Sequence, residues 1–405
     1  MGVFVIALLC VVTAPVAGEA AELGPDDNFC ARLNSLPEGE EVVLAPGEYQ
    51  GACTIRRGGT ADSPLVIRAA DPYRPPHLVY DGQTSNVLNV RADHVVIRGL
   101  RFGPTQRNVD AIRVYSRADV TVEDCEFSGV GGIAIVANSA STRGLTVRRN
   151  VIEDSAATAM YFGCHDGVAC ALSGLLVERN YIHRVRAPAG EVGYGLQVKL
   201  NSSGIIRDNV IVDTKGPGIM VYGSRERATA SVLERNFVMG SRTSSGIVIG
   251  GGPAMVRSNI AVSNWEAGIG LEDYGRRRLL RDIVVAHNTV YNNFSGGILL
   301  PGNGLREVII VNNAAHARLG TAALPGAHTG ARISGNVDCA RSPCFRNPDG
   351  RDFSPLVGSP LIGLGVMGVD AWAPRDDFFG VPRGIPPTVG AVERAAGAVL
   401  LGPKP

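Results

Sequence analysis

The sequence predicts an all-β fold, a single-stranded right-handed parallel β-helix of about ten coils or more. Within each repeat, apolar residues alternate with other residues, as in Gly195-Leu-Gln-Val-Lys, which is typical of short strands with one inward face. Two β-type residues follow each repeat's asparagine, which favours three strands per coil over the strand and helix of a leucine-rich repeat. The repeated asparagines are 23 to 30 residues apart, a spacing typical of solenoids: Asn150, Asn180, Asn209, Asn236, Asn259, Asn288, Asn313 and Asn336.

The asparagine column has a physical role in such a solenoid. Side chains at one position of successive coils lie ~4.8 Å apart, so stacked asparagines can hydrogen-bond along the axis and satisfy the bent backbone of a turn. We therefore expect these side chains inside the solenoid. Two earlier coils carry Leu100 and Cys125 in the same column, so Cys125 is expected to be a buried free thiol.

The chain divides into four parts. Residues 1–21 resemble a secretory signal peptide, whose apolar run is too short to span a membrane. Residues 22–86 are expected to form an N-terminal cap and the first coils, with Asp26 or Asp27 capping a short helix at 28–36 that covers the open end of the solenoid. Residues 87–337 carry the β-helix repeats, and residues 338–405 are expected to form a C-terminal cap and a tail along the solenoid.

The cysteines indicate an oxidising compartment. Three short-range pairs fit disulfides, Cys30 with Cys53, Cys164 with Cys170, and Cys339 with Cys344. Together with the signal peptide, they predict a secreted or periplasmic protein. The net charge of +1 gives no indication of a nucleic-acid partner, and we expect a monomer without a membrane span.

The second strand of each coil predicts a surface charge ladder. Its outward residues alternate in sign, so each charge lies between two opposite charges one strand spacing away. Each exposed pair of this kind contributes little to stability, and the ladder is interpreted as structural. Its members are Arg98, Glu123, Arg148, Glu178, Arg207, Glu234 and Arg257.

The first strand of each coil has no such alternation. Instead, side chains suited to binding or catalysis gather on its neighbouring coils. One outward column is interpreted as Asn89, Arg113, Ala134, Tyr161, Gln197, Met220, Val248 and Gly270. The other is interpreted as Arg91, Tyr115, Val136, Gly163, Lys199, Tyr222, Gly250 and Glu272.

Two insertions flank these columns, the loop Cys164–Cys170 and the segment Arg184–Tyr194. Loops of unequal length beside a flat sheet form walls, so we expect a cleft on the coils of Tyr161, Lys199 and Tyr222. Lys199 and Tyr222 are predicted to be exposed, catalytic neighbours on successive coils. The predicted substrate-binding residues are Arg113, Tyr115, Tyr161, His165, Gln197 and Arg225.

A lysine beside a tyrosine, with arginine nearby, is suited to β-elimination on a uronic acid. A cation or hydrogen-bond donor must neutralise the sugar carboxylate, so that the proton on C5 becomes acidic. Lys199 can remove that proton if positive neighbours lower its pKa. Tyr222 can then protonate the departing 4-oxygen. The sequence thus favours a lyase that acts on an anionic polysaccharide.

At fold level the chain resembles secreted, pectate-lyase-like solenoids, and most closely polysaccharide lyases of the alginate lyase/chondroitinase B type. The motif similarity runs from Gly190-Glu191 to Asn209, with Lys199 at the position of the base. Those lyases have an arginine on the following coil, where this sequence has Tyr222, and their paired acidic Ca²⁺ ligands are not reproduced. The resemblance implies that Arg113, Arg225 or Gln197 neutralises the carboxylate. We expect no cofactor, with Ca²⁺ as the alternative.

Other functions use the same groove. A C5-epimerase would use the same base and return the proton to the opposite face of the sugar. A glycoside hydrolase would use a carboxylate pair such as Glu272 and Asp273, although a salt bridge from these residues to 276–278 is the favoured interpretation. A carbohydrate-binding or structural solenoid would use the tyrosines for stacking alone. His165 and Asp166 could form a pair, but a solvated loop accounts for them better.

Overall fold

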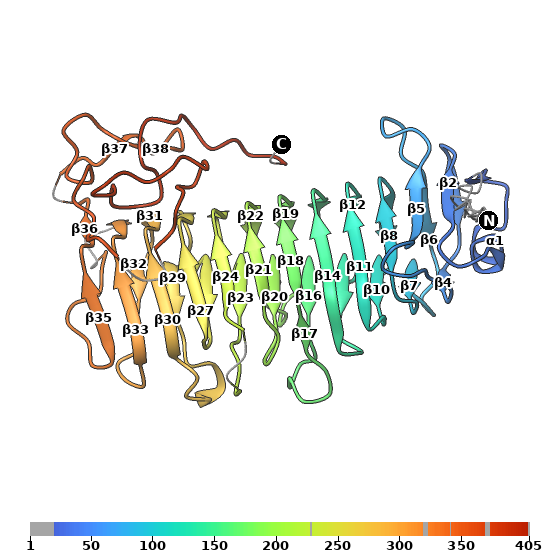
Figure 1. The fold of residues 1–405 in the computed structure, drawn as a ribbon, viewed down its shortest axis with the longest axis horizontal. Coiled ribbons are helices and arrows are strands. Elements are labelled where there is room, and N and C mark those ends of the chain that lie inside the picture. The colour runs from blue at the N-terminus through green and yellow to red at the C-terminus, as the bar shows by residue number, and fades with distance from the viewer. Residues whose placement is uncertain (1–19, 227–228, 319–322, 341, 369–372, 404–405) are drawn as a thin grey trace, which may run out of the picture.

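The computed structural model describes residues 20–226, 229–318, 323–340, 342–368 and 373–403, so nearly all of the predicted signal peptide lies outside the described residues. The described chain winds into a parallel β-helix, and successive coils contribute strands to three long sheets (Figure 1). This confirms the predicted fold class. None of the helices in the described ranges is long and apolar enough to cross a membrane.

We name the sheets A, B and C. Sheet A contains β1 (Ala21–Leu23), β2 (Glu41–Leu44), β5 (Leu65–Ala69), β8 (Val95–Arg98), β11 (Ala118–Glu123), β14 (Thr142–Arg148), β18 (Leu175–Glu178), β21 (Gly204–Arg207), β24 (Ser231–Glu234), β27 (Ala254–Arg257), β30 (Arg281–Ala286), β33 (Arg306–Val311) and β35 (Ala331–Ser334), with β17 (Leu172–Ser173) beside β14.

Sheet B follows sheet A in each coil and contains β3 (Glu48–Gln50), β6 (His77–Tyr80), β9 (Arg101–Thr105), β12 (Glu126–Ser128), β15 (Val151–Glu153), β19 (Tyr181–Val185), β22 (Val210–Thr214), β25 (Phe237–Met239), β28 (Ile260–Val262), β31 (Thr289–Asn293), β34 (Ala314–Ala317) and β36 (Val337–Asp338).

Sheet C holds the strands that carry the predicted site. It contains β4 (Cys53–Ile55), β7 (Leu88–Val90), β10 (Ile112–Val114), β13 (Ile135–Ala137), β16 (Met160–Phe162), β20 (Leu196–Val198), β23 (Ile219–Val221), β26 (Ile247–Ile249), β29 (Ala267–Leu271) and β32 (Gly296–Leu299).

The asparagine column lies inside the solenoid, at the turn from sheet A to sheet B, as predicted. Asn209 is fully buried; its Nδ2 donates to Asn236 Oδ1 (2.9 Å) and to the carbonyl of Val177 (2.9 Å). Its Oδ1 accepts from both the backbone N and the Nδ2 of Asn180. The residue before each asparagine often has a left-handed backbone, as Asp208 does (φ 57°), so the turn needs side-chain partners for its backbone groups.

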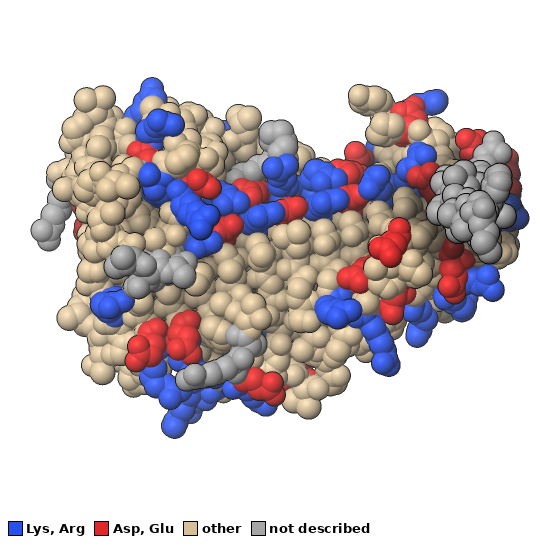
Figure 2. All heavy atoms as spheres, viewed as in Figure 1, with Lys and Arg blue, Asp and Glu red and all other residues tan. Residues whose placement is uncertain are grey.

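The charge ladder on sheet A also forms as predicted. In Figure 2 it is the band of alternating Lys/Arg and Asp/Glu colours that runs along the solenoid. Glu123 accepts from Arg148 (2.6 Å) and from Arg149 (2.9 Å) and also pairs with Arg98. The Glu123 side chain is fully buried beneath these guanidiniums. This member of the ladder is therefore a buried ion pair, whereas the sequence predicted exposed pairs.

A short helix covers the N-terminal end of the solenoid. Helix α1 (Phe29–Ser35) buries Phe29 and Leu33 against the first coils, and a disulfide from Cys30 to Cys53 ties it to β4. The expected capping residue is wrong: Asn28, not Asp26 or Asp27, accepts from the backbone N of Ala31 (3.1 Å).

After sheet B ends, the C-terminal segment folds back along the solenoid (Figure 1). It contains an antiparallel pair, β37 (Phe345–Asn347) and β38 (Asp352–Pro355). Apolar residues of this segment pack on outward residues of sheet B, including Val210, Phe237 and Ile260. The predicted disulfides from Cys164 to Cys170 and from Cys339 to Cys344 are both formed, and Cys125 is free and buried, as expected.

Candidate functional site

The outward columns of sheet C differ from the prediction at one coil. Arg113 of β10 pairs in register with Val136 of β13, so Val136 and not Ala134 belongs in its column. The prediction is two residues out of register because Gly131 and Gly132 belong to the turn before β13: Gly132 N donates to the carbonyl of Val109. Tyr161, Gln197, Met220 and Val248 follow in the column as expected.

Lys199 and Tyr222 are neighbours directly after β20 and β23, as predicted. The Nζ of Lys199 lies 4.0 Å from the ring centroid of Tyr222 and 5.3 Å from that of Tyr161. The expected exposure is wrong, since Lys199 is 3% exposed and Tyr222 is 2% exposed. Loops from other coils close over both residues, which the repeat pattern alone does not indicate.

A glycine makes room for Lys199 on the preceding coil. Gly163 has φ +94°, and a Cβ there would lie 2.3 Å from Ser202 Oγ and 3.1 Å from the Cβ of Lys199. Ser202 Oγ itself accepts from the backbone N of Leu172 (2.9 Å), so this packing is fixed. A larger residue at position 163 would displace Lys199 from its position beside Tyr161.

The Lys199 amine is a buried cation without an acidic partner. Within the described residues, Nζ makes no ion pair and donates no hydrogen bond to a protein acceptor; its close neighbours are the two aromatic faces. Burial, with the charge of Arg277 adding to it, lowers the pKa of Lys199 from its usual 10.5 to about 8. A substantial part of the population is therefore neutral, and able to accept a proton, at mildly alkaline pH.

Tyrosines from the insertion 184–194 and from the segment that follows β29 contact Tyr222. Tyr194 ends the predicted insertion 184–194, and its hydroxyl lies 3.1 Å from that of Tyr222. The ring of Tyr274, from the short helix η1 (Tyr274–Arg276), meets the Tyr222 ring edge-on at 4.9 Å. Burial raises the pKa of Tyr222 well above its usual range, so its phenol keeps its proton. Burial likewise raises the pKa of Tyr161 to about 12.

Arg277 is the functional candidate that the sequence analysis missed. Its guanidinium carbon lies 5.8 Å from the centroid of the Tyr222 ring and 5.2 Å from that of Tyr274. Its Nη1 is buried and has no hydrogen-bond partner among the described residues. A buried donor without a protein partner is unfavourable, so this atom is free to bind water or an acceptor group of a ligand. The run of three arginines at 276–278 was the available signal.

Of the six predicted binding residues, Tyr161 and Gln197 lie beside Lys199, whereas Arg113 and Tyr115 lie on a coil further along sheet C. Gln197 is 3% exposed and pairs in register with Tyr161. Arg113 is held by Asp110 (2.6 Å) and Asn138 (2.8 Å), three strands from Lys199.

Tyr115 stacks under the guanidinium of Arg91 at 4.2 Å, on the same coil as Arg113. The exposed Arg225 is joined to the coil of Lys199 through its backbone N, which donates to Asn201 Oδ1 (2.9 Å). The structure thus replaces Arg113 by Arg277 as the cation nearest the Lys199–Tyr222 pair.

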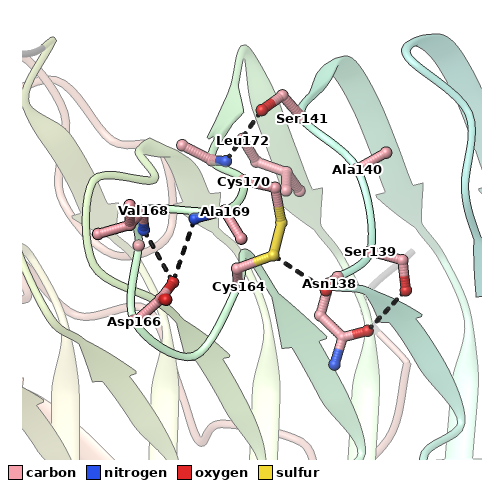
Figure 3. Close-up of a disulfide and its surroundings, with 12 residues drawn as sticks. Asn138, Ser139, Ala140, Ser141, Cys164, Asp166, Val168, Ala169, Cys170 and Leu172 are labelled. Atoms are coloured by element: carbon pink, nitrogen blue, oxygen red, sulfur yellow. Dashed lines mark hydrogen bonds between the residues drawn. A yellow bond between two sulfur atoms is a disulfide. The ribbon is translucent and has the colours of Figure 1, made fainter.

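The disulfide loop Cys164–Cys170 follows β16, the strand of Tyr161. Figure 3 shows the hydrogen bonds within this loop. Asp166 Oδ1 accepts from the backbone N of Val168 (2.8 Å) and of Ala169 (3.2 Å), and these bonds lower the pKa of Asp166. Asn201 Nδ2 donates to the carbonyl of Gly167 (2.8 Å), which anchors the loop to the coil of Lys199. His165 is exposed, and no bond joins it to Asp166 among the described residues.

Comparison with known proteins agrees with this architecture. The family model described as right handed beta helix region matches residues 110–277 and 166–337, which together span more than half of the chain. The chain belongs to the right-handed β-helix family. No curated protein sequence matches it.

Several solved right-handed β-helices have a similar structure. Pectate lyase Pel9A is 14% identical over 93% of this chain and 97% of its own, with a TM-score of 0.52. The Dettilon tailspike protein (gp208) is 15% identical over 78% of this chain and 66% of its own, with a TM-score of 0.51. An alginate lyase from Paenibacillus sp. str. FPU-7 is 17% identical over 67% of this chain and 94% of its own, with a TM-score of 0.49. At these identities the likeness is one of fold, and the match to pectate lyase Pel9A confirms a fold-level resemblance to polysaccharide lyases.

Among the carboxylates around Lys199 and Tyr222, Glu272 continues the column of Tyr222, and Glu266 lies near Glu272. The Glu272 side chain packs against Gly270: a Cβ at position 270 would lie 3.0 Å from Glu272 Oε1. Glu266 accepts a hydrogen bond from Ser245 Oγ (3.3 Å). The expected salt bridge from Glu272 or Asp273 to the arginines at 276–278 does not form in the described residues. Asp273 Oδ1 instead accepts from the backbone N of Arg278 (2.8 Å). The described part of the chain contains no group of three or more His, Cys, Asp or Glu side chains placed to hold a metal ion.

Proposed function

We propose that this β-helix is a carbohydrate-active enzyme, a lyase that cleaves a uronic-acid-containing polysaccharide by β-elimination at Lys199. The observation that carries the proposal is a buried lysine amine with no acidic partner in the described residues, a pKa of about 8, and the unpaired donor of Arg277 nearby. A structural lysine would be paired or exposed, whereas a catalytic base needs a pKa near the working pH.

The reaction assigns one task to each group. The guanidinium of Arg277 binds the uronate carboxylate, so that negative charge developing there is stabilised and the C5 proton becomes acidic. The neutral amine of Lys199 takes that proton, and a double bond forms between C4 and C5. The bond from C4 to its glycosidic oxygen breaks, and this oxygen leaves with a proton from a tyrosine. Atoms and charge balance without a co-reactant.

The tyrosine acid is best described as the pair of Tyr222 and Tyr194. Tyr222 is 2% exposed and its hydroxyl is 3.1 Å from that of Tyr194, which is only partly buried. The proton that Tyr194 gives to the leaving oxygen can be replaced along this hydrogen bond from Tyr222. In this mechanism Lys199 is the base, Tyr222 supplies a proton to Tyr194, and Tyr194 is the group that contacts the sugar.

The three disulfides support an enzyme that works outside the cytoplasm, secreted or periplasmic. Its substrate would then be an extracellular or cell-surface polymer. An anionic polymer fits the unpaired donor of Arg277 and the cationic Lys199 better than a neutral one.

The test is the ultraviolet absorbance of the unsaturated product after incubation with alginate, polygalacturonate and chondroitin sulfate. Wild-type protein should generate it from one of these polymers, and Lys199→Met should not. Exchange of the C5 proton with deuterium, without new absorbance, would instead indicate an epimerase that uses the same base. Normal turnover by Lys199→Met would refute the proposed base and direct attention to Glu266 and Glu272.

A further inference from the structure

A second column of note runs along the turn from sheet B into sheet C. Five residues occupy equivalent positions in this turn on successive coils. The backbone N of each donates to the carbonyl of the residue just before its counterpart on the preceding coil. Trp265 N, for example, donates to the carbonyl of Ser241 (2.8 Å), which directly precedes Arg242. In chain order these five residues are three cations followed by two aromatic residues: Arg186, Lys215, Arg242, Trp265 and Phe294.

The two aromatic side chains are stacked and exposed. The ring centroids of Trp265 and Phe294 lie 4.8 Å apart with an interplanar angle of 1°. Trp265 is 53% exposed and Phe294 is 38% exposed, although both are large and apolar. Two exposed rings held in one orientation present a flat aromatic face to a ligand.

The backbone beneath these rings is rigid. Directly before the aromatic residues, Asn264 Nδ2 donates to Asn293 Oδ1 (2.9 Å), and Asn264 Oδ1 accepts from Ser241 N (3.0 Å). All three of these residues are at most 2% exposed. This second internal ladder fixes the turn, so the rings are positioned before any ligand arrives.

A cavity of about 440 Å³ lies against the rings and is lined by Arg242, Ser263 and Asn292 as well as by Trp265 and Phe294. The guanidinium of Arg242 pairs with Asp213, which is on the coil before its own, whereas Trp265 is on the coil after. An aromatic face beside hydroxyl, amide and guanidinium donors is suited to a sugar ring, whose C–H face is apolar and whose rim is polar.

We infer that Trp265 and Phe294 form a remote subsite that binds sugar units of the polysaccharide outside the reacting pair; the identity of the polymer rests on the proposed function. Strand β29 joins the two places: Trp265 precedes it, and Glu272, which follows it, continues the column of Lys199 and Tyr222. Trp265 and Glu272 are seven positions apart in the sequence, so they are at most roughly 23 Å apart along the strand. Tyr222 and Lys199 lie two and three coils from Glu272, at about 4.8 Å per coil along the axis. A ligand that reaches both must contain several sugar units.

Affinity electrophoresis in gels that contain alginate, polygalacturonate or chondroitin sulfate tests the subsite without requiring turnover. Wild-type protein should be retarded by one of these polymers. Trp265→Ala and Phe294→Ala should each weaken that retardation, and the double variant should lower affinity about tenfold or more. Tyr73→Ala is the matched control, because Tyr73 is a 92% exposed aromatic residue far along the chain. It should bind as wild type does.

The outcomes separate this inference from the proposed function. Retardation that depends on Trp265, with no turnover of any polymer, supports the subsite and contradicts the lyase. Turnover with unchanged retardation of the double variant supports the lyase and refutes the subsite. Retardation by none of the polymers refutes the subsite as well. A dimer that Trp265→Ala dissociates, with sugar binding unchanged, would show that the rings contact a second copy of the chain.

Discussion

Replacing Lys199 by methionine should abolish turnover and, at neutral pH, make the protein more stable. Methionine has nearly the same length and carries no charge, so the variant resembles wild-type protein with a neutral amine. Lys199 is 3% exposed and has no acidic partner in the described residues to offset the burial of its charge. Catalytic groups held in unfavourable surroundings commonly reduce stability in this way.

The magnitude follows from the pKa. Lowering it from 10.5 to about 8 means that the charged amine is disfavoured in the folded protein by about 3 kcal/mol. The contact with the Tyr222 face, at 4.0 Å, returns up to about 2 kcal/mol of this. Lys199→Met should therefore raise the free energy of unfolding by about 1 to 3 kcal/mol at pH 7.

The dependence on pH identifies the cause. Below pH 8 the lysine is protonated in both states, so the full destabilisation of wild-type protein is present. Between pH 8 and 10.5 the unfolded state binds the proton and the folded state does not, so wild-type stability rises. The advantage of Lys199→Met should thus shrink over this range and vanish above it.

Chemical unfolding of wild type and Lys199→Met between pH 7 and pH 11 measures this difference. The chain contains three lysines, Lys199, Lys215 and Lys404, so NMR of protein labelled at the lysine Cε can follow each titration separately. Lys215→Met is the control: its Nζ donates to the Glu191 carbonyl (2.6 Å), so this variant should be less stable at pH 7. A difference between Lys199→Met and wild type that stays constant with pH would refute the reasoning.

Three further predictions concern the acid pair and the two ladders. Tyr222→Phe keeps the ring beneath Lys199 but removes its proton, so turnover should fall by roughly 10² to 10⁴ with a weaker effect on binding; a normal rate would exclude Tyr222 from the proton transfer. Asn209→Leu leaves buried backbone groups of the turn without partners and should destabilise by roughly 1–3 kcal/mol in chemical unfolding; an unchanged midpoint would contradict the role of the column. Burial alone would raise the pKa of Glu123, but Arg148 and Arg98 outweigh it and lower that pKa, so the carboxylate adds stability above about pH 4.5 that is lost on acidification. Glu123→Gln should therefore be less stable at pH 7 and should lose less stability than wild type as the pH falls, as thermal unfolding at pH 3 to 7 can show.

The parts that the sequence predicted are those that repeat. A turn of one kind recurs at each asparagine, so stacking of Asn180 on Asn209 follows from the period alone. The sign alternation of the sheet A ladder and the adjacency of Lys199 and Tyr222 follow for the same reason. Each rests on one coil lying over the next in fixed register.

The parts that the sequence did not predict depend on segments that break the repeat. The register at β13 was predicted two residues too early because Gly132 precedes an apolar alternation that resembles the start of a strand, although Gly132 lies in the turn. The repeat period alone does not show which of two such starts enters the sheet. The burial of Lys199 and the position of Arg277 depend on how the insertion 184–194 and the segment after β29 fold back over sheet C. Those paths are determined by side-chain contacts outside the repeat, such as the one between Tyr194 and Tyr222 of the next coil.

This division indicates how a regular solenoid acquires a reactive site. An outward residue on sheet C is exposed unless something from outside the repeat covers it, so regular coils by themselves would leave Lys199 with an ordinary pKa. Gly163 on one side of the Lys199–Tyr222 pair and Gly250 on the other carry no side chains, so the pair is flanked by bare backbone in this column. The longer loops bring Tyr194, Tyr274 and Arg277 over it. The glycines and the insertions together convert one exposed lysine into a buried base, and the stability of the coils tolerates the unfavourable burial of its charge.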